Sequence, residues 1–370
     1  MLNNILRTDI QLMGKTMAID LLSNDDIVYG VTCAIGNEII NVHAKAVIMA
    51  TGGLGRIYSE TTNPKDITAD GLAMAYRAGA QLTGIEFIQF YPYRLGYPKI
   101  LDLNPAIFDD GAIFVNRDGK RFMEAFPRGE HENRDILARE MFKQKDVFLE
   151  LKEMDTNSLV RYPELYRLIR RDSKQKLKMK VAAHFSMGGI LADSIGRTTL
   201  QGLYACGECM GGLHGTNRLA GSALVECAVF GFRTGNAAAE YALKFSHKLP
   251  LKTPDRIDLP LLGLDNTQEI ISSLRKTMWQ YAGIIREAKG LKICKEKLSK
   301  LSDELSQIRP LYYRQWFELK NMLQIANLIV EAALLRKETR GSHYRIDFPD
   351  EELCVRKSII ERGKSIMFQE

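Results

Sequence analysis

The sequence lacks the features that mark membrane proteins and secreted, disulfide-linked proteins. Its longest apolar stretches fall short of the roughly 20 residues that a membrane-spanning helix needs. The amino-terminal residues have no sustained apolar core of the kind found in signal peptides. The few cysteines are scattered without a disulfide-like spacing. We therefore expect a cytoplasmic chain with no transmembrane segment, which can still associate with a membrane through partner subunits.

Features of nucleic-acid binding and metal binding are also missing. The net charge is +6, but basic and acidic residues interleave everywhere except between residues 167 and 180. That run lacks the aromatic residues that stack on bases, so we interpret it as a solvated helix face and expect no nucleic-acid partner. Cys206 and Cys209 have CxxC spacing, but no second pair completes a zinc site. We interpret them as buried thiols rather than metal ligands or a redox pair.

The chain does have enough apolar residues, 45% of 370, to form the cores of two or three domains. Alternating patterns predict a small β-meander followed by a buried strand over residues 46–50. This strand ends at Thr51 and Gly52, and open α/β sheets bind cofactors at the carboxyl ends of their strands. Residues 69–80 have helical periodicity, with Asp70 in the first turn.

The later segments predict a domain organisation. From residue 95 to residue 182 the pattern loosens and becomes charged and helical, which indicates an inserted domain. Residues 183–245 return to strands and turns and end in an apolar helix. After a proline-bearing linker, amphipathic spacing predicts a helical module. We therefore predict an α/β (α+β) protein with a first domain over 1–94 and 183–245, an inserted domain over 95–182 and a carboxyl-terminal helical domain over 246–370.

One apolar segment, from residue 184 to residue 231, concentrates polar side chains. Arg218 must be paired or bind an anion there, because burying a lone charge costs several kcal/mol. Its planar fork matches a carboxylate, and an internal salt bridge with Glu226 is the alternative. His184 precedes a glycine pair whose N–H groups can face a ring or an oxyanion, although a core role is also open. Glu208 follows a strand, where it can accept ribose hydroxyls or serve the structure alone.

Ordered motifs across nearly the whole chain carry a family resemblance. ATGGLGRIY, TADGLAMAYRAGA, EFIQFYP, HFSMGGI, GLYACGE and GLHGTNRLAGSAL resemble segments of the flavoprotein subunits of succinate dehydrogenase and fumarate reductase, and of L-aspartate oxidase. The resemblance implies a partial Rossmann-like FAD-binding domain, an inserted capping domain and a carboxyl-terminal helical domain. It also implies an FAD-dependent oxidoreductase that transfers hydride between flavin and a small dicarboxylate. The alternatives are L-aspartate-oxidase-like activity and a non-catalytic or split scaffold subunit.

The resemblance assigns roles to individual positions. The family's mobile, proton-transferring arginine matches Arg134, and the residues that grip substrate carboxylates match His184 and Arg218. We interpret three side chains of the motif RKETRGSHYRIDFP as partners in structural salt bridges: Arg336, Arg340 and His343. The positions that match the family's FAD contacts are Ala50, Thr51, Gly52, Asp70, Glu208, Ala223 and Leu224.

The sequence departs from the family pattern at the substrate site. Tyr91 stands where the family has a histidine, and Asn104 replaces the substrate threonine, so we expect these two side chains to contact the substrate. Pro105 and Phe108 stand at the glutamate and the arginine of the proton relay. Since neither can carry a proton, the relay is absent unless one of the aspartates at 109 and 110 fills the gap.

A second departure concerns the cofactor. The family's glycine-rich GxGxxG turn, which holds the FAD pyrophosphate at a helix amino terminus, is not found in this sequence. The resemblance therefore implies either a fragment or a chain that works with a separate flavin-binding polypeptide. An iron–sulfur electron-transfer subunit is a further expected partner.

Overall fold

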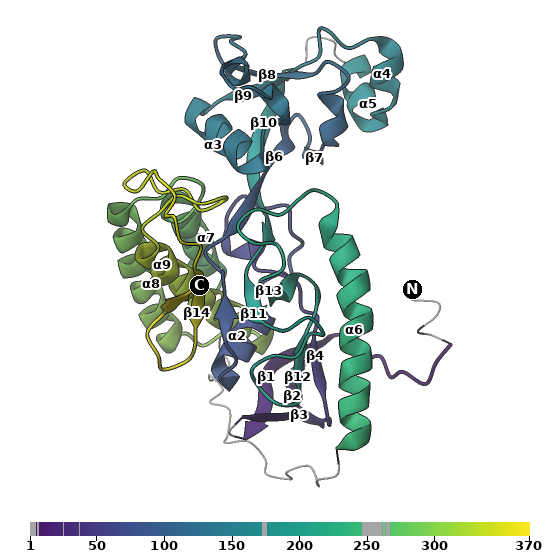
Figure 1. The fold of residues 1–370 in the computed structure, drawn as a ribbon, viewed down its shortest axis with the longest axis vertical. Helices are drawn as coiled ribbons and strands as arrows, with labels where there is room; N and C mark the ends of the chain where they lie inside the picture. The colour runs from purple at the N-terminus through teal and green to yellow at the C-terminus, as the bar shows by residue number, and fades with distance from the viewer. Residues whose placement is uncertain are drawn as a thin grey trace.

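The computed structural model describes residues 5, 7–24, 26–36, 38–171, 176–245, 261, 263 and 267–370. These residues form a base, a cap joined to it by two long strands, and a layer of carboxyl-terminal helices against the base (Figure 1). The predicted mixture of sheets and helices is confirmed.

The base contains three small sheets that meet near the proposed cofactor residues. The predicted meander is an antiparallel sheet of β1 (Thr16–Asn24), β2 (Ile27–Ile35) and β3 (Glu38–His43). The predicted buried strand is β4 (Val47–Met49), which pairs in parallel with β12 (Leu203–Ala205). The helix α2 (Asp70–Ala78) lies against β1, and its apolar side is buried. The remaining sheet has the order β13 (Met210–Gly211), β11 (Gly189–Leu191), β5 (Leu82–Thr83), β14 (Lys357–Ile360) and β15 (Met367–Gln369).

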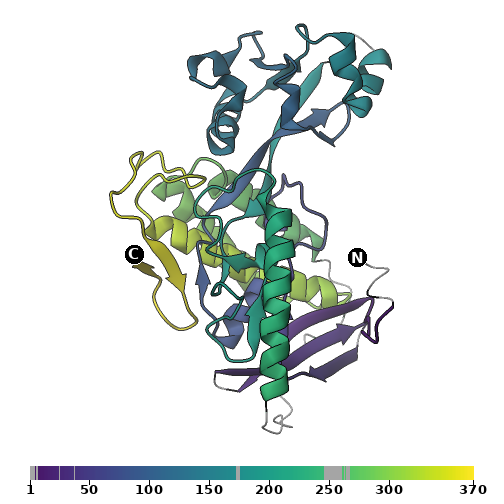
Figure 2. The same cartoon turned by 45° about the vertical axis from the view of Figure 1, so that its right-hand side comes forward.

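Two antiparallel strands, β6 (Ile88–Tyr97) and β10 (Leu177–Ser186), run from the base into the cap (Figure 2). Their apolar side chains are mostly buried, because each strand packs on both faces. The other cap strands are β7 (Leu101–Asp102), β8 (Ile113–Asn116) and β9 (Val147–Glu150). The cap helices are α3 (Arg134–Gln144), α4 (Thr156–Val160) and α5 (Pro163–Arg171). The segment predicted as an inserted domain thus forms most of the cap.

Among the described residues, four long helices follow in the carboxyl-terminal half of the chain. They are α6 (Ser222–Lys244), α7 (Gln268–Tyr281), α8 (Ala288–Gln307) and α9 (Tyr313–Leu335). The helix α9 is buried along much of its length and packs against α2 and α8. The segment after these helices also contributes a strand to the base, because β14 pairs with β5, with Ile359 opposite Thr83. Helical periodicity carries no information about such a long-range pairing.

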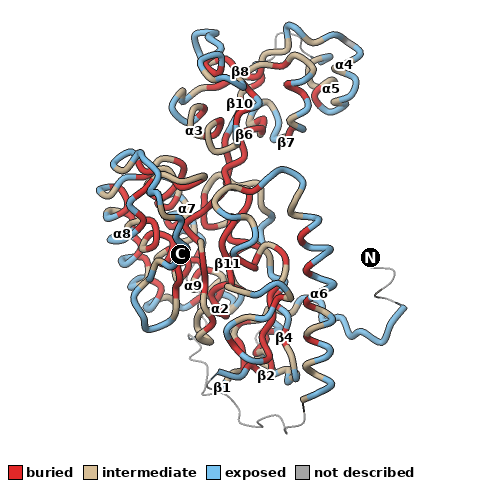
Figure 3. The backbone as a smooth tube through the Cα atoms, in the orientation of Figure 1, coloured by how far each residue is buried: buried red, intermediate tan, exposed pale blue. Residues whose placement is uncertain are grey.

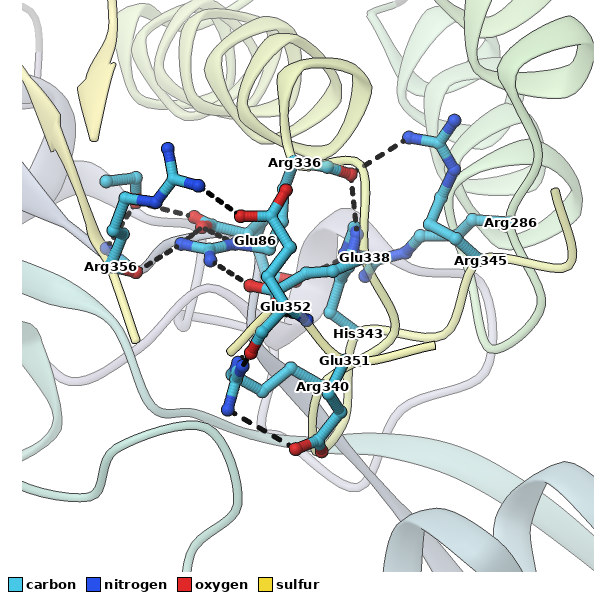
Figure 4. A network of polar contacts seen from close by, with 12 residues as sticks. Glu86, Arg286, Arg336, Glu338, Arg340, His343, Arg345, Glu351, Glu352 and Arg356 are labelled. Atoms are coloured by element: carbon cyan, nitrogen blue, oxygen red, sulfur yellow. Dashed lines mark hydrogen bonds and ion pairs between the residues drawn. The ribbon is translucent and has the colours of Figure 1, made fainter. Parts of the chain in front are cut away.

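Arg336 lies at the centre of a buried polar network that joins the last segment to the base (Figure 4). It binds Glu86 at 2.9 Å and Glu338 at 2.7 Å, and all three side chains are at most 3% exposed. Arg340 binds Glu338 at 2.8 Å, and His343 Nδ1 lies 2.8 Å from Arg286 Nη1. Burial, followed by the nearby arginines, lowers the pKa of His343 well below its ordinary value. The structural interpretation of Arg336, Arg340 and His343 agrees with these contacts.

Replacing Glu86 by alanine should destabilise the fold by about 3 kcal/mol, because it removes one carboxylate from the buried Arg336. The same change also removes the acceptor of the Ser358 hydroxyl, at 2.9 Å. Glu351→Ala is the matched control, since that carboxylate is 61% exposed and lies 3.4 Å from Arg340; we expect it to cost less than about 1 kcal/mol. Denaturant unfolding measures both, and equal losses would contradict the structural role of the network.

Candidate active site

Side chains from the cap and the base meet on one amide oxygen. Gln89 on β6 is 1% exposed, and its Oε1 accepts hydrogen bonds from Arg134 Nη1 at 3.1 Å and from Arg218 Nη2 at 3.0 Å. Its Nε2 donates to the Arg218 carbonyl at 2.8 Å, which fixes the orientation of the amide. Arg134 begins α3 of the cap, whereas Arg218 precedes α6 of the base. The two guanidinium groups are therefore held together by a neutral acceptor.

The positive charge of this cluster meets no carboxylate at ion-pair distance among the described residues, and Glu208 and Glu226 act on Arg218 only from farther away. In the described part of the chain, neither Arg134 nor Arg218 forms a salt bridge, and the buried Arg218 Nε has no hydrogen-bond partner. The alternative of an Arg218–Glu226 pair is wrong, because Glu226 binds His214 instead at 2.8 Å. Burial and then the Arg134 charge lower the pKa of Arg218. Two cations on a neutral oxygen form a site that favours an anion.

His184 lies beside this pair in its neutral form. Its ring stacks on Tyr91 with a centroid distance of 4.6 Å, and its Nδ1 lies 2.8 Å from Thr62 Oγ1. Burial, then the charges of Arg218 and Arg134, lower the pKa of His184 to about 4. At neutral pH the imidazole therefore offers a hydrogen bond without adding a third positive charge.

Aromatic side chains surround the Arg134 guanidinium. Its Cζ lies 5.3 Å from the Tyr91 ring centroid and 6.0 Å from that of Tyr93. The Tyr91 hydroxyl donates to the Leu103 carbonyl at 2.7 Å. Phe108 packs against Tyr93 at 5.5 Å, so an apolar ring occupies the position that the resemblance gives to the relay arginine.

Neither aspartate replaces the relay. Asp110 accepts a hydrogen bond from the Tyr162 hydroxyl at 2.6 Å and pairs with Arg161. Asp109 is 69% exposed and lies 3.7 Å from His131. Both carboxylates thus face cap residues rather than Arg134.

Asn104 does not join the cluster in this structure. It is exposed, and its Oδ1 accepts a hydrogen bond from the Ala106 N–H at 3.0 Å, as the N-cap of the short helix η2 (Pro105–Ile107). A proline in the first turn and an asparagine N-cap favour the start of a helix. The Asn104 side chain is therefore engaged in this local hydrogen bond.

The proposed cofactor residues fall into two neighbouring groups. Thr51 and Asp70 line a cavity of about 690 Å³ between β1, β2 and α9. Gly52, three residues after the end of β4 and two after Ala50, has φ +73°, a conformation that favours glycine. Both Asp70 oxygens are already bound at 2.6 Å, by Thr68 Oγ1 and Asn321 Nδ2. Asp70 therefore shapes this end of the sheet through protein contacts.

The second group surrounds Glu208 in the short helix η5 (Gly207–Cys209). Its Oε1 accepts a hydrogen bond from the Ser186 N–H at 3.0 Å, and burial raises its pKa to about 7. A Cβ on Gly53 would lie 2.0 Å from this oxygen, so the glycine permits the close approach of the two groups. Ala223 packs against Phe185 and its neighbours, whereas Leu224 is 83% exposed.

Sequence reasoning missed four side chains that complete the site. Asn217 Nδ2 donates to Asp135 Oδ1 at 2.7 Å, which gives a second contact between base and cap beside the two arginines. Thr62 orients His184, and Gln89 orients both arginines. Gln89 and Asn217 lie within the EFIQFYP and GLHGTNRLAGSAL motifs, so their position in these motifs was the available signal.

The chain is similar to known flavoproteins. A family model described as an FAD binding domain matches residues 1–224, and one described as the carboxyl terminus of the fumarate reductase flavoprotein matches residues 271–362. An FAD-dependent oxidoreductase of Methanocaldococcus jannaschii, described as uncharacterized, is 35% identical over 97% of this chain and 71% of its own length. The L-aspartate oxidase of Yersinia pestis is 34% identical over 93% of this chain and 69% of its own length.

The chain belongs to the succinate dehydrogenase and fumarate reductase flavoprotein family. One of the subunits of the fumarate reductase (CoM/CoB) of Methanothermobacter marburgensis is 33% identical over 97% of this chain and 72% of its own length. A solved E. coli quinol fumarate reductase chain superposes with a TM-score of 0.82 at 25% identity, over 96% of this chain and 71% of that one. This flavoprotein is thus an FAD-dependent oxidoreductase, as predicted.

The residues present fit FAD in two respects. The positive φ of Gly52 opens the backbone at the end of β4, where a parallel sheet receives a cofactor. The buried Glu226 Oε1 and Arg218 Nε have no partner among the described residues, which leaves polar groups for a ligand near Glu208.

Two further findings concern membranes and metals. Within the described ranges of this flavoprotein, no helix combines the length and apolarity needed to cross a bilayer. Those ranges also contain no group of His, Cys, Asp and Glu side chains placed to hold a metal ion. Cys209 is buried and lies 3.1 Å from the Met49 carbonyl, and burial raises its pKa to about 11, which agrees with the interpretation as a buried thiol.

The fold should become less stable as the pH falls from 6.5 towards 4. The reason is that the pKa of His184 is about 4 in the folded chain, whereas the ordinary pKa of histidine is 6.5. In this window the unfolded chain binds a proton that the folded chain excludes, so stability rises with pH by up to about 1.4 kcal/mol per unit. His184→Gln should flatten this part of the curve in urea unfolding. His43→Gln, an exposed position on β3, is the control, and parallel curves for wild type and His184→Gln would contradict the buried neutral state.

Proposed function

We propose that this flavoprotein transfers hydride between FAD and a small carboxylate held between the cap and the base. The observation that carries the proposal is the convergence of Arg134 and Arg218 on Gln89 Oε1 with no carboxylate to pair them. A substrate carboxylate supplies the missing negative charge and fits the fork geometry of both guanidinium groups.

Each residue of the cluster has a role in this proposal. Arg218, on the base, holds a substrate carboxylate, and neutral His184 donates or accepts a hydrogen bond at the same end. Arg134, on the cap, moves one proton to or from the substrate carbon. Tyr91 closes the site by stacking on His184, at 4.6 Å. Because Arg134 arrives with α3, closing the cap also excludes water from the reacting atoms.

FAD, when bound, supplies the hydride acceptor or donor. The chain's own contribution to holding it comes from the end of β4, the start of α2, η5 and the start of α6. The proposed contacts are Ala50, Thr51, Gly52, Asp70, Glu208, Ala223 and Leu224.

Oxidation of an amino dicarboxylate, as in L-aspartate oxidase, is the second candidate. Phe108 and the capped turn at Asn104 and Pro105 favour it over fumarate reduction, because they leave no proton relay towards Arg134. Reduction of fumarate needs a proton delivered to carbon, and Phe108, which packs on Tyr93 at 5.5 Å, cannot pass a proton on to Arg134.

We also propose partners and a location. Electrons leave or enter through a second polypeptide, either a flavin-binding chain or an iron–sulfur subunit. The six cysteines are all free thiols, five of them at least partly shielded from solvent, which agrees with a reducing cytoplasm. Association with a membrane would come from such partners.

Arg134→Ala should lower turnover by about 100-fold or more while FAD stays bound, because general acid–base catalysis contributes on that order. The assay uses this chain together with its proposed partner chain. It measures anaerobic reduction of the flavin by L-aspartate and by succinate, and reoxidation of the flavin by fumarate. Lys143→Ala on the same helix is the control, since its amine is 44% exposed and pairs with Glu140. Two results would contradict the proposal and favour a scaffold. One is full activity in Arg134→Ala, and the other is bound flavin that none of these compounds oxidises or reduces.

Arg218→Gln should abolish binding of a small dicarboxylate, because it removes one of the two charges that the anion meets. In wild type, malonate at 100 times its dissociation constant should stabilise the fold by about 2.7 kcal/mol, and in the variant by close to nothing. The measurement is thermal unfolding with and without malonate. Arg233→Gln, whose guanidinium lies in α6 over Phe230, is the control and should keep the wild-type response.

A further inference from the structure

Arg134, in the first turn of α3, has few contacts of its own. Among the described residues, its guanidinium forms one hydrogen bond, to Gln89 Oε1 at 3.1 Å. Its other neighbours are the faces of Tyr91 and Tyr93. Fixing a long arginine side chain costs rotamer entropy, which a single hydrogen bond offsets only in part. The position of the guanidinium therefore depends on where α3 is held.

One side of α3 faces the base. Asp135, Arg139 and Phe142 follow each other at spacings of four and three residues, so their side chains lie on the same side of the helix. Figure 3 shows the strands β6 and β10 as mostly buried where they join cap and base, and much of α3 as intermediate. The junction thus has a buried part, the strands, and a partly exposed part, this side of α3.

Two charged side chains of α3 contact residues of the base. Asp135 Oδ1 accepts a hydrogen bond from Asn217 Nδ2 at 2.7 Å. The Arg139 Cζ lies 4.4 Å from the centroid of the Tyr344 ring. A hydrogen bond to a carboxylate and a guanidinium over an aromatic face are both favourable contacts that hold two surfaces in a defined orientation.

The rest of this junction touches without interlocking. Phe142 and Trp279 meet edge to face with ring centroids 6.3 Å apart, and Phe142 is still 39% exposed. A cavity of about 10 Å³ lies between cap and base, with Ala138 and Ser342 among the residues that line it. Protein cores leave few gaps of this kind. A small number of polar and aromatic contacts therefore holds α3 on the base.

We propose that Asp135 and Arg139 are positioning residues for Arg134. Through Asn217 and Tyr344 they hold α3 on the base, and the placement of the helix sets the Arg134 guanidinium in the site. Both side chains are engaged with the base, so they act through the helix and not on the substrate. This role rests on the proposed function, which gives Arg134 the proton transfer.

The positioning role predicts which kinetic constant changes. Arg218 and His184 belong to the base, so they still hold a substrate carboxylate when α3 shifts. Proton transfer by Arg134 needs close alignment with the substrate carbon, and a misplacement of about 1 Å can cost on the order of 100-fold in rate. Loss of a contact between α3 and the base should therefore lower kcat by more than it raises KM.

Two pairs of variants test this prediction in the chain with its proposed partner chain. Tyr344→Leu removes the ring face under Arg139, whereas Tyr344→Phe keeps it. Asp135→Ala removes the acceptor for Asn217, whereas Asp135→Asn keeps an oxygen that can accept the same hydrogen bond. The first variant of each pair should lower kcat about tenfold or more with FAD still bound. The second should restore turnover close to that of wild type.

Trp279 reports the placement of α3 without flavin or substrate. The chain has two tryptophans, so Trp316→Phe leaves Trp279 as the single fluorophore. Phe142 of α3 packs against Trp279 in this structure. In this background, acrylamide should quench the fluorescence more strongly in Asp135→Ala and in Tyr344→Leu than in the parent chain. The melting temperature should stay close to that of the parent.

Arg170→Gln is the matched control. The Arg170 Cζ lies 5.7 Å from the centroid of the Tyr166 ring, and both residues belong to α5 of the cap. The variant removes a contact of the same kind that does not join cap and base. Both turnover and quenching should therefore stay as in wild type.

The two measurements separate the positioning role from the proposed function. Unchanged quenching in both Asp135→Ala and Tyr344→Leu overturns the role, and so does increased quenching with unchanged kcat. A loss of turnover that the conservative variants share, or that follows the melting temperature, also overturns it in favour of a purely structural contact. If the wild-type protein itself shows no turnover, the proposed function fails. The quenching then decides the placement of α3 alone, since an increase supports the two contacts and no change overturns them.

Discussion

The hydrogen bonds that Gln89 Oε1 accepts from Arg134 and Arg218 are the contact on which the site depends. Two guanidinium groups repel each other, and a neutral oxygen that is 1% exposed offsets only part of that repulsion. The junction of cap and base therefore carries positive charge that is only partly compensated, and it favours binding of an anion. In the proposed function, a carboxylate that enters pairs with both arginines at once, which would couple substrate binding to cap closure.

The same balance of charge explains the state of the imidazole. A third cation beside Arg134 and Arg218 would be costly in a buried site, and His184 accordingly has a pKa of about 4. Its ring stacks on Tyr91 with a centroid distance of 4.6 Å. The cluster thus combines two permanent charges with a neutral hydrogen-bonding group, a set suited to orient an acid rather than to neutralise it completely.

Buried charge is handled differently on the other side of the base. Arg336 itself meets two carboxylates, with Glu86 at 2.9 Å and Glu338 at 2.7 Å. Arg286, which belongs to the same network, is held by the backbone carbonyls of Gly283 and Glu86 and by His343 instead. The network ties the last strands to the base. Arg336 thus differs from Arg134 and Arg218, which share a neutral acceptor and form no ion pair among the described residues.

The sequence by itself determined the local elements and the identity of the chemistry-bearing side chains. Alternation predicted β1 to β4, helical spacing predicted α2 and α6, and ordered motifs pointed to Arg134, His184 and Arg218, because these signals depend on neighbours along the chain. Only the tertiary structure decided the partners. It paired Glu226 with His214 rather than Arg218, used Asn104 as a helix cap and put β14 beside β5. Such contacts join residues tens to hundreds of positions apart, or depend on which of several nearby acceptors a side chain reaches, and periodicity in sequence carries no information about either.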